Sequence, residues 1–237
     1  MPHLDTIGFD ADDTLWHNER FYRLTQERFA AILADHAAPD DLSMRLLAAE
    51  KRNLARYGYG IKGFTLSMIE TALEVTDNAV SGAEIRLILD AAQEMLEHPV
   101  EPLPHARAAL TELAGKHRLV LITKGDLFDQ ERKLAASGLG DFFHAVEIVS
   151  EKTSRTYRDV FRRHGTGAGN ALMAGNSLRS DILPALEAGS WAVHVPHELT
   201  WELEHAPAPV DHPRFREIAH LGDLPALIDA IGNAAGH

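Results

Sequence analysis

Two aspartates near the start of the chain are spaced for joint chemistry. Asp10 and Asp12 follow the short, largely apolar run 4–9. Residues two apart in an extended segment project to the same side, so both carboxylates can face one pocket. Their mutual repulsion would raise one pKa unless a cation lies between them. Magnesium, a hard cation with oxygen ligands, suits such a pair beside a phosphate. The alternative is that residues 10–13 form a turn or a helix cap.

Three later apolar runs, at 119–122, 145–149 and 171–174, also end in polar residues. In an open parallel sheet, ligands bind beyond the carboxyl ends of the strands. We therefore expect these residues to share one site with the two aspartates. They are Thr123, Lys124 and Gly125 after the first run, Lys152 after the second, and Asn176, Ser177, Ser180 and Asp181 after the third.

Two of these groups are candidates for holding phosphate. Thr123 offers a hydroxyl, and with Lys124 and Gly125 it forms a turn whose backbone amides could bind phosphate oxygens at a helix start. Lys152 is the positive charge expected to screen a phosphate from Asp10. A plain helix cap and a solvated lysine are the alternative interpretations.

The second half of the chain alternates between helical and strand patterns. Such alternation is typical of right-handed βαβ units in a parallel sheet. The uniformly apolar run 119–122 fits a sheet covered on both faces. We expect strands at 4–9, 119–122, 145–149, 171–174 and 191–195, and helices at 105–116, 126–137, 153–164 and 180–188.

The stretch from 20 to 97 is different, because its apolar residues recur at helical spacing in four stripes. Ser81 and Glu84 have the spacing of a capping box before the fourth stripe. Helices cannot pair with the first strand, so this bundle is predicted to be an insertion. The expected fold is α/β: a doubly wound parallel-sheet (Rossmann-like) core at 1–17 and 99–237, with a four-helix cap at 18–98.

The composition of the chain limits which partners, which covalent chemistry and which cellular location we expect for the protein. The 237 residues carry a formal charge of -12, which argues against a nucleic-acid or anionic-membrane partner. With no cysteine, disulfides and thiol nucleophiles are excluded. Residues 1–10 lack a signal-peptide pattern, and no window approaches the roughly 20 apolar residues of a membrane helix. We expect a soluble, cytoplasmic protein.

The run Phe9-Asp10-Ala11-Asp12-Asp13-Thr14-Leu15 resembles the first signature of the haloacid dehalogenase superfamily, an apolar strand followed by DxDxT. Thr123 is similar to the second signature of that family, Lys152 to the third, and residues 175–181 to the fourth, GDSxxSD. The resemblance spans 4–15 and roughly 104–195. The helical insertion lies where one large branch of the family has its cap domain.

The resemblance implies a magnesium-dependent phosphohydrolase for a small phosphorylated metabolite. Asp10 would attack phosphorus and become an aspartyl phosphate, which splits one displacement into two easier ones. Asp12 would protonate the leaving oxygen and then deprotonate the hydrolytic water. By the same resemblance, Thr123, Lys124, Gly125 and Lys152 would hold the phosphoryl group, and Asp10, Asp12 through its main chain, Asn176 and Asp181 are the candidate metal ligands.

The chain departs from the family pattern at two positions. Asn176 stands where aspartate is usual, which removes one negative charge from the metal site, and Asp13 replaces a frequent glycine. Two other functions therefore stay open: a 2-haloacid dehalogenase, and a catalytically silent phosphate-ester binding protein. Asp12 favours phosphate, because dehalogenases of this family lack that second aspartate.

Three weaker signals remain. Trp16, His17 and Glu19 follow the nucleophile and could contact the leaving group of the substrate, or pack at a hinge. The glycine-rich stretch 165–169 precedes a strand, which fits a connection better than a dinucleotide loop. The loose cluster of His194, His197, His205 and His212 shows no convincing metal spacing within one element.

Overall fold

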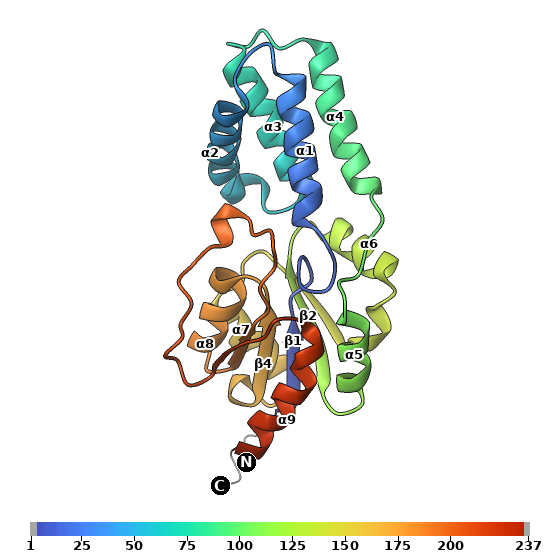
Figure 1. Cartoon of the computed structure of the whole chain (residues 1–237), viewed down its shortest axis with the longest axis vertical. Helices are drawn as coiled ribbons and strands as arrows, with labels where there is room; N and C mark the ends of the chain where they lie inside the picture. Colours follow the sequence, from blue (N-terminus) through green and yellow to red (C-terminus); the bar gives the residue numbers. More distant parts are fainter. Residues whose placement is uncertain (1–3, 235–237) are drawn as a thin grey trace. The chain divides into compact units, whose positions relative to one another are not determined.

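The computed structural model of the protein describes residues 4–234, which divide into two compact units (Figure 1). The first unit comprises residues 4–19, 100–124 and 131–234. The second comprises residues 20–99 and 125–130. Residues 20–99 thus interrupt the first unit soon after its first strand. That the first unit is catalytic and the second a substrate-selecting cap stays a prediction.

A six-stranded sheet forms the centre of the first unit. Its strand order is β3-β2-β1-β4-β5-β6, and every neighbouring pair is parallel. The chain reverses its direction of winding between β1 and β4, so the carboxyl end of β1 lies at the switch point where such sheets bind ligands. The strands are β1 (Thr6–Phe9), β2 (Arg118–Lys124), β3 (Ala145–Val149), β4 (Ala171–Gly175), β5 (Trp191–His194) and β6 (Phe215–Glu217).

Helices cover both faces of this sheet, which is why its central strands are apolar on both sides (Figure 1). On one face, Phe9 and Leu121 pack with Leu110 of α5 and Ile228 of α9. On the other, Ile122 packs with residues of α7 and α8, including Phe161. The helices are α5 (Ala106–Ala114), α6 (Leu127–Ser137), α7 (Ser154–His164), α8 (Leu183–Glu187) and α9 (Leu224–Ala234).

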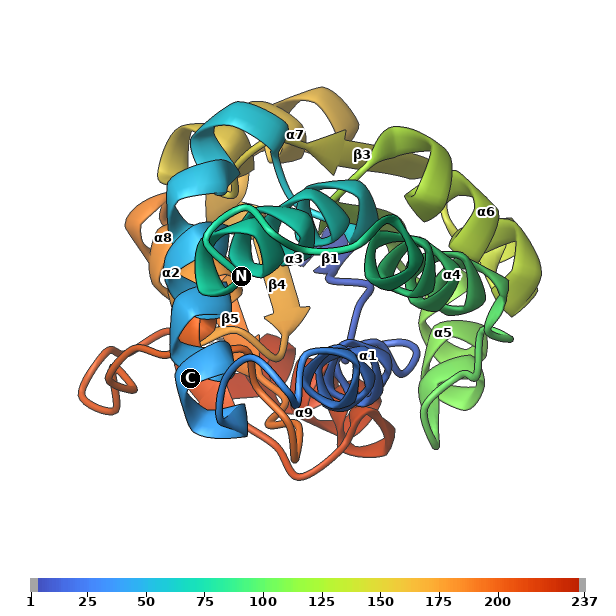
Figure 2. The same cartoon turned by 90° about the horizontal axis from the view of Figure 1, so that it is seen from above.

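The second unit contains four helices with a core of their own. In it α2 packs beside α3, and α3 beside α4 (Figure 2). Residues 125–130 belong to this unit, and Lys62 donates to Asp126 at 2.9 Å. The predicted capping box of Ser81 and Glu84 is present. The four helices are α1 (Glu19–Ile32), α2 (Pro39–Tyr57), α3 (Ile61–Val75) and α4 (Gly82–Glu97).

The predicted α/β fold is confirmed, and the predicted elements of the core are found with their ends shifted by at most three residues. Two elements were not predicted: β6 and α9, which extend the sheet and cover one face. The helix expected at 180–188 begins with a π-helical turn, Leu178–Ile182, before α8. Among the described helices, none has the length and apolar character needed to cross a membrane.

Candidate active site

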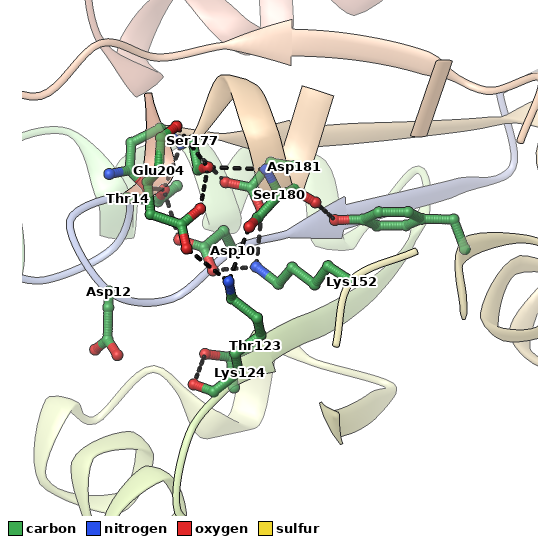
Figure 3. A network of polar contacts seen from close by, with 12 residues as sticks. Asp10, Asp12, Thr14, Thr123, Lys124, Lys152, Ser177, Ser180, Asp181 and Glu204 are labelled. Carbon is green, nitrogen blue, oxygen red and sulfur yellow. Dashed lines mark hydrogen bonds and ion pairs between the residues drawn. The ribbon is translucent and has the colours of Figure 1, made fainter. Parts of the chain in front are cut away.

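The carboxyl end of β1 places Asp10 beside a buried lysine. Lys152, which follows β3, donates both to Asp10 Oδ1 and, at 2.7 Å, to Asp181 Oδ1 (Figure 3). All three side chains are buried, Asp10 being 6% exposed. The lysine therefore bridges the predicted nucleophile and the fourth signature. The two contacts join residues that are 142 and 29 positions apart in the sequence.

Burial and neighbouring charges act in opposite directions on the pKa values of Asp10 and Lys152. Burial raises the pKa of Asp10 from 3.8 to about 7, although Lys152 opposes the rise. Burial alone would lower the pKa of Lys152, but the two carboxylates raise it above its usual value. The raised pKa of Lys152 requires an ionised Asp10 beside it. A pKa of about 7 for Asp10 would instead leave half of the Asp10 carboxyl groups protonated at neutral pH, so the two shifts imply different charge states for Asp10. Direct contact with the ammonium favours the charged form of Asp10, and a divalent cation would favour it further.

The second oxygen of Asp10 belongs to a group of hard oxygen ligands. Asn176 Oδ1 lies 3.2 Å from Asp10 Oδ2, from the main-chain oxygen of Asp12 and from Thr14 Oγ1. With the amide nitrogen turned to this side, Asn176 would donate to all three. With the oxygen on this side, the donor set suits magnesium, which prefers such ligands. The residues present therefore fit the metal, with an amide where the family has a carboxylate.

Asp181 organises the turn that carries Asn176. Its Oδ2 accepts from the backbone amide of Ser177 at 2.9 Å, while Oδ1 accepts from Lys152. Gly175 is required at the end of β4, because a Cβ there would lie 2.3 Å from Asp181 Oδ2. The side chain of Asp181 is thus committed to the lysine and to the turn. Its predicted role as a metal ligand, direct or through water, stays a prediction.

The end of β2 carries the residues predicted to hold phosphate. Thr123 is buried, and its hydroxyl contacts the carbonyl oxygen of Lys124 at 3.3 Å. Lys124 donates to Ser180 Oγ at 2.8 Å and to Glu204 Oε1 at 2.6 Å (Figure 3). Gly125 follows with φ of 145°, where a Cβ would overlap the side chain of Gln130. Phosphate binding by residues 123–125 stays a prediction.

Asp12, the predicted acid/base, points away from the Asp10 carboxylate (Figure 3). Its Oδ1 accepts from the indole nitrogen of Trp16 at 2.7 Å and from Lys133 Nζ at 2.6 Å. Only its main-chain oxygen faces Asn176. To exchange a proton at the phosphoryl group, the Asp12 side chain would therefore have to rotate about its side-chain bonds.

The residues after Asp10 hold the local backbone. Trp16 is fully buried in the core and donates to Asp12, and its contact with a substrate stays a prediction. His17 lies edge-on to His197, with ring centroids 5.8 Å apart. Asp13 adopts a positive φ of 59° and accepts from the amide of Glu19, which begins α1. Burial raises the pKa of Asp13 to about 6, against the effect of His197.

Three contributors to the site were not predicted from the sequence. Thr14 donates to Asp10 Oδ2 at 3.1 Å and accepts from the backbone amide of Asn176. Its place in the DxDxT signature could have identified it. Lys133 and Glu204 stand in no motif. Their charges are ordinary for surface positions, so only the fold brings them to Asp12 and Lys124.

The histidines between residues 194 and 234 do not form a metal cluster. His194 instead contacts Glu217 at 2.8 Å and the main-chain oxygen of Asn176, in the fourth signature, at 3.1 Å. Within residues 4–234, no group of three or more His, Cys, Asp or Glu side chains is arranged to hold a metal ion. A magnesium site here would therefore use amide and main-chain oxygens beside the carboxylate of Asp10.

A family model described as haloacid dehalogenase-like hydrolase matches residues 4–189. The glyceraldehyde 3-phosphate phosphatase of Methanothermobacter thermautotrophicus is 30% identical over 208 residues, which are 83% of this chain and 88% of that protein. The region matched by the family model includes Asp10, Thr123, Lys152 and Asp181.

Solved structures agree with the family model. A haloacid dehalogenase-like hydrolase from Xanthomonas campestris has a TM-score of 0.88 and 42% identity, covering 98% of this chain and 94% of that one. The hydrolase YfnB of Bacillus subtilis, solved bound to magnesium, shares the fold at a TM-score of 0.65 and 17% identity, covering 96% of this chain and 99% of that one. Because the family model covers most of its length, this protein belongs to the haloacid dehalogenase-like hydrolases.

Proposed function

We propose that the chain hydrolyses a small phosphate monoester through an aspartyl phosphate on Asp10. The observation that carries the proposal is the buried contact of Lys152 with Asp10 and Asp181, beside the side-chain amide of Asn176 and the main-chain oxygen of Asp12. A nucleophilic carboxylate next to a cation and a hard-ligand set suits attack on phosphorus, whose equatorial oxygens carry the charge of the transition state.

In the first step, a carboxylate oxygen of Asp10 forms a bond to phosphorus, and the bond from phosphorus to the ester oxygen breaks. Asp12, turned toward the site, gives that oxygen its proton, and the alcohol leaves. In the second step, Asp12 takes a proton from water, whose oxygen attacks the phosphorus and releases phosphate and the Asp10 carboxylate. Lys152, Thr123 and the amides of residues 124–125 would hold the phosphoryl oxygens.

Magnesium is the proposed cofactor, held by Asp10, the main chain of Asp12 and Asn176, with Asp181 acting directly or through water. When bound, it would neutralise charge on the phosphoryl group and hold it in place. The structure of YfnB with magnesium is in keeping with this assignment for the fold. The missing charge at Asn176 predicts weaker metal binding than a site with two carboxylates would give.

The substrate class is a small phosphorylated metabolite. The relative from Methanothermobacter thermautotrophicus is named for glyceraldehyde 3-phosphate, and a mouse relative, 30% identical over 53% of this chain, for N-acylneuraminate 9-phosphate. We infer a phosphate on a primary carbon of a small polar molecule, with the helical unit selecting among such molecules. A cytoplasmic location would place the enzyme with metabolites of this kind.

One assay tests the function. The chain is incubated with an aryl phosphate, with magnesium or with a chelator, beside Asp10→Asn and the exposed control Asp141→Asn. We expect metal-dependent phosphate release that falls on the order of 10³-fold or more in Asp10→Asn and is unchanged in Asp141→Asn. Activity that survives in Asp10→Asn would refute the mechanism. Halide release from a 2-haloacid in the absence of metal would favour the dehalogenase function. Binding of phosphate esters without turnover at any magnesium concentration would favour the silent binding protein.

A further inference from the structure

Glu204 joins two of the strand ends that form the site. It ends a short turn, Glu202–Glu204, in the connection between β5 and β6. Its Oε1 accepts from Lys124 at the end of β2, and its Oε2 accepts from Ser177 after β4 (Figure 3). A carboxylate from outside the four signatures is therefore bonded both to the end of β2, which is proposed to hold phosphate, and to the fourth signature, which is proposed to hold the metal.

The segment that carries Glu204 is fastened to the fourth signature. Arg179 Nη1 donates to the carbonyl oxygen of Leu203 at 3.1 Å. The side chains of Lys124 and Glu204 are only 11% and 15% exposed, so water screens their attraction less than at the surface. This ion pair is consequently a fixed part of the site.

Lys124 lies on the same face of the sheet as the nucleophile. Side chains alternate along a strand, and Ile122 of β2 contacts the position of Gly8 in β1, so Lys124 and Asp10 follow on that face. Figure 3 shows the ammonium groups of Lys124 and Lys152 both pointing toward Asp10. Lys152 is already shared between two carboxylates, so Lys124 is a second cation for an incoming phosphoryl group.

We propose that Lys124 binds the phosphoryl group and that Glu204 is its internal counter-ion, which limits how tightly the site holds phosphate. The proposal rests on the proposed function, since it assumes that a phosphoryl group enters this site. That group must displace the present partners of Lys124 or share the lysine with them. When a phosphate enters, Lys124 already donates to Ser180 and to the carboxylate of Glu204, which lies beside the entering charge. Repulsion between like charges in a poorly hydrated site lowers the affinity, which favours release of the phosphate product.

This role predicts opposite effects for the two partners of one ion pair. Loss of the lysine charge removes an attraction for phosphate, whereas loss of the glutamate charge removes a repulsion. A purely structural ion pair predicts the same sign for both, because breaking it from either side disturbs the same loops. The sign of the effect of Glu204→Gln therefore decides between the two roles.

The test is calorimetric titration of the full chain with inorganic phosphate in the presence of magnesium. We expect Lys124→Gln to raise the Kd for phosphate about tenfold or more, and Glu204→Gln to lower it about three- to tenfold. Glu204→Asp keeps the charge and is expected to stay near the unsubstituted value. Glu147→Gln, which removes one carboxylate from a pair with Arg163, controls for net charge and should have no effect.

Weaker phosphate binding in Glu204→Gln would overturn the proposal, as would an unchanged Kd in Lys124→Gln or an unsubstituted chain that binds no phosphate. Lys124→Arg, which keeps the charge, guards against misfolding of Lys124→Gln and should bind phosphate within a few fold of the unsubstituted chain. The titration requires no turnover. A chain that hydrolyses phosphate esters but shows effects of equal sign refutes this inference and leaves the proposed function intact.

Discussion

Lys133 Nζ lies 2.6 Å from Asp12 Oδ1, and this contact holds the predicted acid/base side chain on the side away from Asp10. Lys133 also donates to Asn18 Oδ1 at 3.1 Å, so its ammonium is fixed from two directions. Trp16 donates to the same oxygen of Asp12. The carboxylate therefore has two defined partners in this position, and proton transfer at the phosphoryl group requires it to leave at least one of them.

The role of Asp12 as general acid can be tested through the leaving group. Asp12→Asn should slow hydrolysis of alkyl phosphates by about 10²- to 10⁴-fold, because their alkoxide needs a proton. The formation of the intermediate from nitrophenyl phosphate should slow much less, since nitrophenolate leaves unprotonated. Rapid-quench measurement of alcohol release separates this step from hydrolysis of the intermediate. Equal losses for both substrates would argue against Asp12 as the acid.

Lys133 is expected to influence the reaction only through Asp12. Lys133→Met removes the ammonium that holds Asp12 Oδ1 away from Asp10, and we expect kcat for alkyl phosphates to rise by up to about tenfold, with much less change for nitrophenyl phosphate. Lys133→Arg, which keeps a donor and the charge, should stay near the unsubstituted rate. The decisive measurement is the double variant with Asp12→Asn. An effect of Lys133→Met that persists without Asp12 would show that the lysine acts elsewhere.

The sequence was sufficient for the fold because its signals are local. Apolar runs and helical stripes predicted the parallel sheet and the four inserted helices, and both are present. β6 has only three residues, two of them exposed, so periodicity could not reveal it. The π-helical turn was missed for another reason: its Asp181 accepts from Lys152, 29 residues away in the chain, and no local pattern contains that tertiary contact.

The candidate site was predictable only as far as its motifs extend. Asp10, Lys152 and Asp181 were expected together and do meet, since each lies in the segment that follows the carboxyl end of a strand. The direction of the Asp12 side chain was not predictable, because it depends on Lys133, 121 residues away in the chain. Glu204 was likewise hidden, as it lies in a connection with no regular pattern.

The capping box of α4 gives a prediction for the dependence of stability on pH. Hydrogen bonds from the side chain and backbone of Ser81 lower the pKa of Glu84 to about 2 from 4.5. A carboxyl whose pKa is depressed by folding adds stability above its unfolded pKa and loses it as the pH falls. Glu84→Gln should therefore lower the thermal midpoint at pH 7, and the difference should vanish as the pH falls from about 4.5 to about 2.

Ser81→Ala serves as the matched variant for this experiment. It removes the hydroxyl that accepts from the amide of Glu84 at 3.1 Å, a bond that does not itself titrate, and also the hydroxyl's contribution to the lowered pKa of Glu84, which does. The part of its stability loss that comes from the amide bond should therefore persist at low pH, where the loss of Glu84→Gln has disappeared. Thermal unfolding followed by circular dichroism at several pH values checks both. A constant difference for Glu84→Gln across the range would contradict the assigned shift.

Asn176 allows a direct test of the metal site. Asn176→Asp would place a second negative charge 3.2 Å from Asp10 Oδ2 and from the main-chain oxygen of Asp12. Without a cation the two carboxylates repel, so the variant should be less stable than the unsubstituted chain in a chelator. With magnesium the added charge becomes a ligand, and we expect the Kd for magnesium to fall about tenfold or more, which is about 1.4 kcal/mol.

Calorimetric titration with magnesium measures this Kd, and the thermal midpoint with and without the metal gives a second readout. Asn170→Asp makes the same chemical change outside the site, where the amide donates to Thr166, and should leave both quantities unchanged. If Asn176→Asp binds magnesium no more tightly than the unsubstituted chain, residue 176 is not a metal ligand. In that case the oxygens around Asp10 are held together by the amide nitrogen of Asn176, and the metal must be sought at Asp181.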